Sequence, residues 1–214
     1  MQDTASNAAR PQRAVIQVWI DFVRPYCLLG ESIVAEATAG LDVDIAWMPF
    51  ELRPYPTPTL RPEDDYLPSA WENGVYPAAR RAGVDIRLPS VSPQPYSRKA
   101  FLGLQLAMQH GKADAYVDAV MRAFFQDDRD IGDTTVLKEI LGRLGVPADE
   151  LDAVLASRSC NERHDAALQF AREVGIRAVP SVAIGRRLFA GIPEAGDLRA
   201  AILAHIGTKA GNGA

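Results

Sequence analysis

The tetrapeptide Arg24-Pro25-Tyr26-Cys27, here called the RPYC motif, combines residue types whose spacing suits chemistry. Pro25 permits only a turn or the first turn of a helix, which places Cys27 one turn inside a helix. There, the positive end of the helix dipole and the Arg24 guanidinium both favour a thiolate. Cys27 is thus a candidate reactive thiol, but packing under the loop as a small apolar residue is the favoured interpretation.

Arg24 occupies the start of the same helix. A guanidinium cannot attack a disulfide, and with a pKa above about 12 it does not act as an ordinary base. Beside the free N–H groups of a helix N-terminus it could bind a carboxylate, a thiolate or a phenolate, and a solvated surface arginine is the alternative. The Tyr26 phenol could reach the same ligand or pack instead. Arg53 could face the same cleft, but a salt bridge at its rim is the favoured interpretation.

Other titratable residues give weaker signals. Asp21 ends the first predicted strand, where it could be a buried carboxylate that tunes Cys27, or could form a cap or a rim hydrogen bond. The three histidines, His110, His164 and His205, lie on separate predicted helices without ligand spacing. Each is expected at the surface or at a helix end, and no metal site is predicted.

The pattern between residues 14 and 50 predicts a β-α-β unit that positions the motif. Residues 14–22 form an apolar run rich in β-branched and aromatic types, and residues 28–39 repeat apolar side chains at helical spacing. Residues 42–50 alternate in hydrophobicity and end at a proline. Strands joined by such a crossover helix are parallel.

Residues 51–97, here called the collar, carry most of the prolines. This composition predicts a long irregular excursion with at most one short helix near residues 69–82, and such ordered excursions commonly determine substrate specificity. Four amphipathic helices are expected next, at residues 98–109, 113–125, 134–144 and 148–156.

The C-terminal part returns to alternating helices and strands. A helix, two strands around a Gly185-Arg186 turn and a last helix are expected at residues 159–174, 181–184, 187–190 and 195–206. The order β-α-β, helical insertion, α-β-β-α predicts an α/β protein with a thioredoxin-like core. The expected divisions are disordered tails at 1–13 and 208–214, core parts at 14–60 and 159–207, and an inserted helical or lid region at 61–158.

Four segments resemble the DsbA-like thioredoxin superfamily, in particular its FrnE-like branch, which is similar to 2-hydroxychromene-2-carboxylate isomerases and kappa-class glutathione transferases. They occur in family order across nearly the whole chain, and they are DFVRPYCLLG at 21–30, MPFELRP at 48–54, GIRAVPS at 175–181 and AGIP at 190–193. The resemblance implies a helical domain inserted in a thioredoxin core.

The resemblance also implies a cis bond between Val179 and Pro180, facing the RPYC motif. Such a bond would turn the Val179 backbone toward an extended peptide or the backbone of glutathione. Redox members of the superfamily carry Cys-x-x-Cys, and a serine tends to occupy the first position in transferases and isomerases. Because Arg24 stands there in this chain, the usual dithiol cycle within the motif is chemically unavailable.

The amino-acid composition limits the classes of binding partner that we expect. Lys and Arg number 23 and Asp and Glu 27, so the net charge of −4 and the pI of about 5.4 give no reason to expect nucleic acid or an anionic membrane. No apolar run is long enough to cross a bilayer, and the expected location is the cytoplasm. Only two cysteines are present, Cys27 and Cys160. A bridge between them and a homodimer both stay open.

Two functions from different classes fit these observations. The favoured one is an enzyme that acts on a small organic or thiol-conjugated substrate, as an isomerase or transferase or an atypical thiol oxidoreductase, in a cleft between the motif and the cis-proline loop. Its candidate residues are Cys27 and Arg24 for catalysis, and Pro25, Tyr26, Arg53, Val179 and Pro180 for binding. No tightly bound cofactor is expected, with glutathione or another low-molecular-weight thiol as the candidate co-substrate. The alternative is a non-catalytic relative that binds a peptide, a biosynthetic intermediate or a partner protein.

Overall fold

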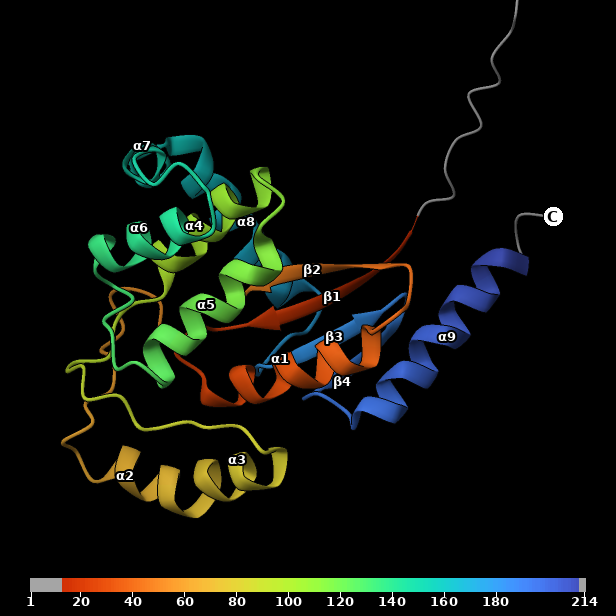
Figure 1. The fold of residues 1–214 in the computed structure, drawn as a ribbon, viewed down its shortest axis with the longest axis horizontal. Helices are drawn as coiled ribbons and strands as arrows, with labels where there is room; N and C mark the ends of the chain where they lie inside the picture. Colours follow the sequence, from red (N-terminus) through yellow and green to blue (C-terminus); the bar gives the residue numbers. More distant parts are fainter. Residues whose placement is uncertain (1–12, 212–214) are drawn as a thin grey trace, which may run out of the picture.

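A mixed sheet forms the centre of the computed structural model, which describes residues 13–211 and side chains up to residue 208 (Figure 1). Its strands are β1 (Ala14–Ile20), β2 (Val43–Pro49), β3 (Ser181–Ile184) and β4 (Arg187–Ala190). They follow the order β2-β1-β3-β4, with β1 parallel to β2 and antiparallel to β3. The predicted α/β class and thioredoxin-like core are thus confirmed.

Helices cover the sheet and complete its core. Helix α1 (Pro25–Thr38) packs against α9 (Ala195–Gly211), which lies to the right of α1 and the strands in Figure 1. Helix α8 (Arg158–Glu173) packs on β2 and stacks Phe170 against Trp19, with ring centroids 6.3 Å apart. Strand β1 can therefore be buried along most of its length, which is why its sequence is nearly all apolar.

The ends of the chain differ in part from the predicted tails. Arg13 forms salt bridges with Asp42 and Asp44, so the N-terminal tail does not include it. Helix α9 continues to Gly211, so the prediction that a disordered C-terminal tail begins at residue 208 is wrong for residues 208–211. Residues 1–12 and 212–214, where the remainder of both tails was expected, lie outside the described residues.

The collar contains more helix than its prolines suggest. Helix α2 (Tyr66–Ala70), the π-helical turn η1 (Trp71–Val75) and α3 (Tyr76–Ala82) follow one another without interruption, where only one short helix was predicted. Pro77 stands in the first turn of α3 and lacks an N–H. A helix can cross such a residue when the turn before it widens, and the π-helical turn lies at that place.

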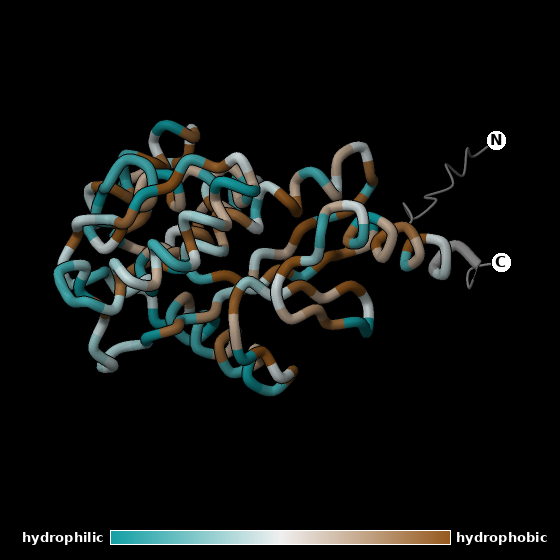
Figure 2. The backbone as a smooth tube through the Cα atoms, turned by 90° about the horizontal axis from the view of Figure 1, so that it is seen from below, coloured by the Kyte–Doolittle hydropathy of each residue, from teal (hydrophilic) through white to brown (hydrophobic). Residues whose placement is uncertain are grey.

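Four helices of the insertion follow the collar, as expected. They are α4 (Arg98–Gln109), α5 (Ala113–Phe125), α6 (Thr134–Arg143) and α7 (Glu150–Ala156). The Thr135 N–H donates to the Asp133 carboxylate at 2.8 Å and caps α6. These helices share the core of the sheet, because the rings of Phe22 and Phe101 are 4.8 Å apart. In the view from below, hydrophobic stretches run along the strands and continue into this helical group (Figure 2).

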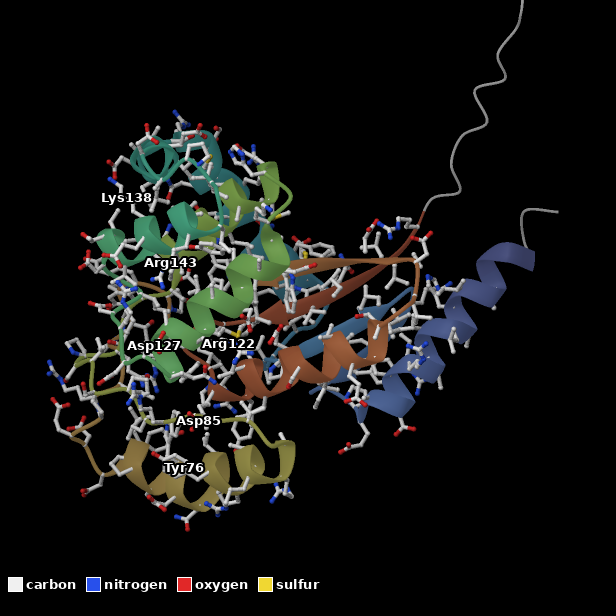
Figure 3. The ribbon with its side chains drawn as sticks, viewed as in Figure 1. Tyr76, Asp85, Arg122, Asp127, Lys138 and Arg143 are labelled. Atoms are coloured by element: carbon white, nitrogen blue, oxygen red, sulfur yellow. The ribbon has the colours of Figure 1, made fainter. Side chains whose placement is uncertain are left out.

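The collar is fastened to the end of α5. The Arg87 N–H donates to the Phe125 carbonyl at 2.9 Å, and the Gln126 amide donates to the Asp85 carbonyl at 2.7 Å. Figure 3 shows Tyr76 and Asp85 of the collar below the end of this helix.

No helix among residues 13–211 combines the length and the hydropathy that a bilayer span needs.

Candidate functional site

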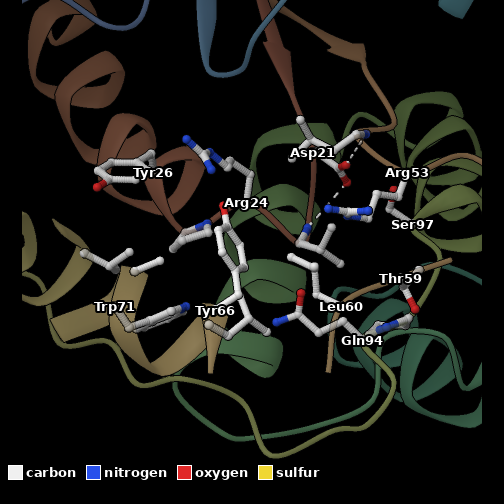
Figure 4. A pocket seen from close by; sticks show the side chains of 17 residues that line it. Asp21, Arg24, Tyr26, Arg53, Thr59, Leu60, Tyr66, Trp71, Gln94 and Ser97 are labelled. Atoms are coloured by element: carbon white, nitrogen blue, oxygen red, sulfur yellow. Dashed lines mark hydrogen bonds between the residues drawn. The ribbon is translucent and has the colours of Figure 1, made fainter. Parts of the chain in front are cut away.

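A cavity of about 260 Å³ lies between the N-terminus of α1 and the collar (Figure 4). We call it the motif-collar cavity. Charged and hydrogen-bonding groups line one part of it, and aromatic and aliphatic groups line the rest. The residues that line it are Asp21, Val23, Arg24, Pro25, Tyr26, Leu52, Arg53, Thr59, Leu60, Tyr66, Leu67, Ala70, Trp71, Val75, Gln94, Pro95 and Ser97.

Two arginines give the cavity a positive side. The Arg24 guanidinium lies 4.8 Å from the centre of the Tyr26 ring, and its buried Nε has no hydrogen-bond partner among the described residues. Arg53 donates to the Pro58 carbonyl at 3.2 Å. Neither arginine forms a salt bridge within residues 13–208, so the rim salt bridge favoured for Arg53 is wrong. Both residues line the cavity, and in Figure 4 the Arg53 guanidinium points inward while the Arg24 guanidinium points toward Tyr26.

Tyr26 connects the two walls of the cavity. Its hydroxyl reaches the main chain of the collar at Gly74, where a Cβ atom would lie only 2.9 Å from the phenol oxygen. A side chain at Gly74 would therefore force the collar away from α1. Tyr26 thus combines a packing role with a place in the cavity wall.

Asp21 is the buried carboxylate of the site, with only 1% of its surface exposed. Its oxygens accept the N–H of Leu52 at 2.7 Å and that of Val23 at 3.4 Å. Burial raises the pKa of Asp21 to about 6, although hydrogen bonds from Ser97, Leu52 and Val23 oppose this rise. The group can therefore gain and lose a proton near neutral pH.

Cys27, the last residue of the motif, is buried and does not line the cavity. Its exposed fraction is 1%, and its sulfur accepts the Asp21 N–H at 3.5 Å. Burial raises the pKa of the Cys27 thiol above its ordinary value, and the opposing effect of the Arg24 charge is smaller. The thiolate that the helix terminus would favour is therefore disfavoured, and the structure matches the favoured interpretation, in which Cys27 is packed as a small apolar residue.

Cys27 is accordingly expected to resist alkylation in the folded protein. Both Cys27 and Cys160 are free and buried, so no bridge joins them. Iodoacetamide labelling followed by mass spectrometry should show Cys27 modified more than about a hundredfold more slowly in buffer than in denaturant, because the thiol reacts only after opening. Labelling of Cys27 at the rate of a small free thiol would contradict this burial.

Val179 and Pro180 lie behind the motif and do not line the cavity. The bond between them is cis, and the Pro180 carbonyl accepts the Gly191 N–H at 3.0 Å. A Cβ on Gly30 would lie 3.4 Å from Pro180 Cγ, so the proline loop packs against α1 one turn beyond the motif. The motif-collar cavity therefore does not extend to the proline loop, and the cleft expected between the motif and this loop stays a prediction.

His164 contradicts the expectation of a surface or helix-end position. It is buried on α8, and its ring Nε2 lies 2.5 Å from a Glu51 carboxylate oxygen. The pattern of apolar residues on α8 does not reveal this pair, because Glu51 is far away along the chain. No group of three or more potential metal-ligating side chains occurs in the described part of the chain.

Sequence reasoning also missed the collar side of the cavity. Tyr66 and Trp71 line it from α2 and η1, and Gln94 lines it from the irregular segment between α3 and α4. The proline content marked this stretch as ordered and functional, but no spacing rule says which of its side chains turn inward. Arg24, Pro25, Tyr26 and Arg53, by contrast, were candidates from the sequence, and all four line the motif-collar cavity.

Comparisons with known proteins agree with this fold. A family model described as DSBA-like thioredoxin domain matches residues 15–202. The uncharacterized protein YwbO of Bacillus subtilis is 38% identical over 180 residues, which span 82% of this chain and 89% of YwbO.

Solved structures show the same architecture. The probable DsbA oxidoreductase SCO1869 from Streptomyces coelicolor is 24% identical, with a TM-score of 0.73 and 91% of each chain covered. A 2-hydroxychromene-2-carboxylate isomerase is 16% identical, with a TM-score of 0.73, and the match covers 92% of this chain and 98% of that one. The chain therefore belongs to the DSBA-like thioredoxin domain family, whose fold serves both oxidoreductases and an isomerase.

Proposed function

We propose that the protein is an enzyme that acts on a small anionic organic molecule or a thiol conjugate in the motif-collar cavity. The observation that carries this proposal is that two guanidinium groups, Arg24 and Arg53, line the cavity without a carboxylate partner among residues 13–208. Guanidinium groups bind carboxylates and related anions with charge-assisted hydrogen bonds. The aromatic and aliphatic walls supply the apolar contact that a small organic ligand needs.

Arg24 takes the role of an electrostatic group where redox relatives have a nucleophile. It is the N-cap residue of α1 and makes no side-chain cap of its own. The N-terminal end of this 14-residue helix adds partial positive charge at the same place. An anion that forms or grows during a reaction would be stabilised there without rearrangement of the site.

Asp21 is the proposed proton-transfer group. It lines the cavity, and its pKa of about 6, raised by burial, places its titration near neutral pH. General acids and bases work best when their pKa lies near the operating pH. Proton transfer beside two fixed cations suits an isomerase or transferase better than a disulfide oxidoreductase.

Thiol chemistry in this proposal comes from outside the chain. Cys27 is buried with a raised pKa, so its sulfur is not available as a nucleophile. We propose glutathione or another low-molecular-weight thiol as the co-substrate, held through its own carboxylates by the arginines. A cytoplasmic location, where such thiols are abundant and cysteines stay reduced, fits this proposal.

The burial of Cys27 also favours a second candidate function. With no nucleophilic sulfur at the cavity, the chain could bind a peptide, a biosynthetic intermediate or a partner protein without turnover. Both candidates need the arginines for anion binding. Only the enzyme needs Asp21 for proton transfer, so conversion of a bound ligand separates them.

The test measures binding of small ligands by calorimetry and by thermal shift. The panel contains benzoate, glutathione and S-hexylglutathione, with benzamide as the uncharged partner of benzoate. Arg24→Gln and Arg53→Gln should each weaken anion binding by about 10- to 100-fold, because a hydrogen bond to a charged group contributes about 1.5–3 kcal/mol. Benzamide binding should change much less.

Arg81→Gln is the matched control, since Arg81 is exposed on α3 and does not line the cavity. It should bind every ligand as the unmodified protein does. Unchanged anion affinity in both Arg24→Gln and Arg53→Gln would overturn the proposal. Bound ligands that return chemically unchanged after incubation with a thiol would favour the non-catalytic alternative.

A further inference from the structure

A second polar pair lies behind the candidate site. His164 on α8 and Glu51, two residues after the end of β2, meet at 2.5 Å, and their side chains are only 1% and 4% exposed. The residues are 113 positions apart in sequence. Neither residue lines the motif-collar cavity, and the charge of Glu51 has only the smallest of the effects on the pKa of Asp21, which it raises. A buried carboxylate is costly without a partner, so this pair fixes where the chain passes at Glu51.

The segment that Glu51 anchors leads directly into the site. Phe50 donates its N–H to the Ile20 carbonyl at 2.9 Å, which ends the pairing with β1. Leu52 follows Glu51, and its N–H donates to the Asp21 carboxylate at 2.7 Å. Arg53 follows and turns its guanidinium into the cavity. Three consecutive residues therefore connect the buried pair with the proton-transfer group and with one of the two cations.

The other half of the pair is rigidly held. The His164 ring lies against the Phe101 ring, with centroids 5.5 Å apart. Beside it on the same helix, Asp165 forms a salt bridge with Arg98 at 2.7 Å, which attaches α8 to the start of α4. Helix α8 thus presents the imidazole from a packed surface and not from a loop.

We propose that His164 and Glu51 are positioning residues for the candidate site. They hold residues 51–53 so that the Leu52 N–H meets Asp21 and the Arg53 guanidinium faces the cavity. This inference rests on the proposed function for its effect on ligands, but its structural part can be tested without any ligand. A pair that only stabilised the fold would affect the whole sheet equally.

The test compares His164→Leu, which removes the polar partner, with Glu51→Gln, which keeps an oxygen acceptor for the ring nitrogen. His110→Leu is the control, because His110 and Glu150 form a looser pair at 3.7 Å with side chains 34% and 50% exposed. Amide hydrogen exchange is followed at Leu52 and at Val18 in the middle of β1. Affinities for benzoate and benzamide are measured on the same proteins.

In His164→Leu, exchange at Leu52 should accelerate about tenfold more than exchange at Val18, because the 51–53 segment opens locally. Benzoate affinity should fall about tenfold while benzamide affinity stays nearly constant. Glu51→Gln should give smaller changes in the same order, and His110→Leu should give none. If His164→Leu does not fold, the comparison of Leu52 with Val18 in Glu51→Gln decides.

Equal acceleration at Leu52 and Val18, or none at either, would overturn the inference. If Leu52 responds as expected but the unmodified protein binds no anion, the proposed function fails while the positioning role stands. If the unmodified protein binds benzoate and the variants bind it equally well, the positioning role fails and the proposed function stands.

Discussion

Arg24→Cys is expected to form a disulfide with Cys27 and so to gain a dithiol cycle within the motif. The Cys27 N–H donates to the Arg24 carbonyl at 2.8 Å, which is the bond of a tight turn. Such a turn brings its first and fourth Cα atoms within about 7 Å, a separation that a disulfide can span. The new cysteine would stand at the helix N-terminus, where thiolates are stabilised.

Oxidised glutathione is the oxidant in the expected reaction. The two thiols of the variant reduce one oxidised glutathione to two molecules of glutathione, and a sulfur-sulfur bond forms between positions 24 and 27. Intact mass spectrometry after incubation with oxidised glutathione should show the loss of two hydrogens. Arg24→Ser and the double variant Arg24→Cys with Cys27→Ser are the controls, and neither should form an internal disulfide. Persistence of two free thiols in Arg24→Cys would mean that the site no longer has the geometry of a redox motif.

The second large effect concerns pH. Because the pKa of Asp21 is raised from 3.8 to about 6 by burial, the folded state binds this proton more tightly than the unfolded state. Below pH of about 4 the group is protonated in both states. Between pH of about 4 and 6 the free energy of unfolding should fall, and its total loss from this group is about 3 kcal/mol. Above pH of about 6 the loss is complete.

Urea unfolding of the unmodified protein and of Asp21→Asn, repeated from pH 4 to pH 7.5, checks this. Hydrogen bonds lower the pKa of Asp165 and Glu63 and give the opposite slope, so the difference between the two proteins is the informative quantity. The free energy of unfolding of the unmodified protein, minus that of the variant, should decrease as the pH rises. A difference that is independent of pH would show that Asp21 titrates at its ordinary value.

The order of helices and strands could be predicted because local sequence patterns indicate each element. The nearly unbroken apolar run of β1 indicates a strand buried on both faces, and Pro25 marks the start of α1. The Asp133 cap marks the start of α6. The helical run in the collar was underestimated, since Pro68 and Pro77 each argue against a helix and only the widened turn between them permits one.

Apart from Arg53, the candidate site was predictable only on the side that belongs to the motif. Arg24 and Tyr26 line the cavity because a strand-to-helix junction exposes its first residues. The burial of Cys27 depends on packing that no local pattern encodes. The pairing of His164 with Glu51 depends on how α8 returns to β2, which is a property of the assembled fold.

The approach of the collar to the motif at Gly74 has a wider consequence. The Gly74 main chain lies close to the Tyr26 phenol and sets how near the collar comes to α1 at this point, while Leu60, Thr59 and Tyr66 line the interior of the cavity. Substitutions at those three positions would alter which molecules fit the cavity and leave the approach of Gly74 to Tyr26 unchanged. A lineage that keeps Gly74 and Tyr26 can therefore acquire new substrates one side chain at a time.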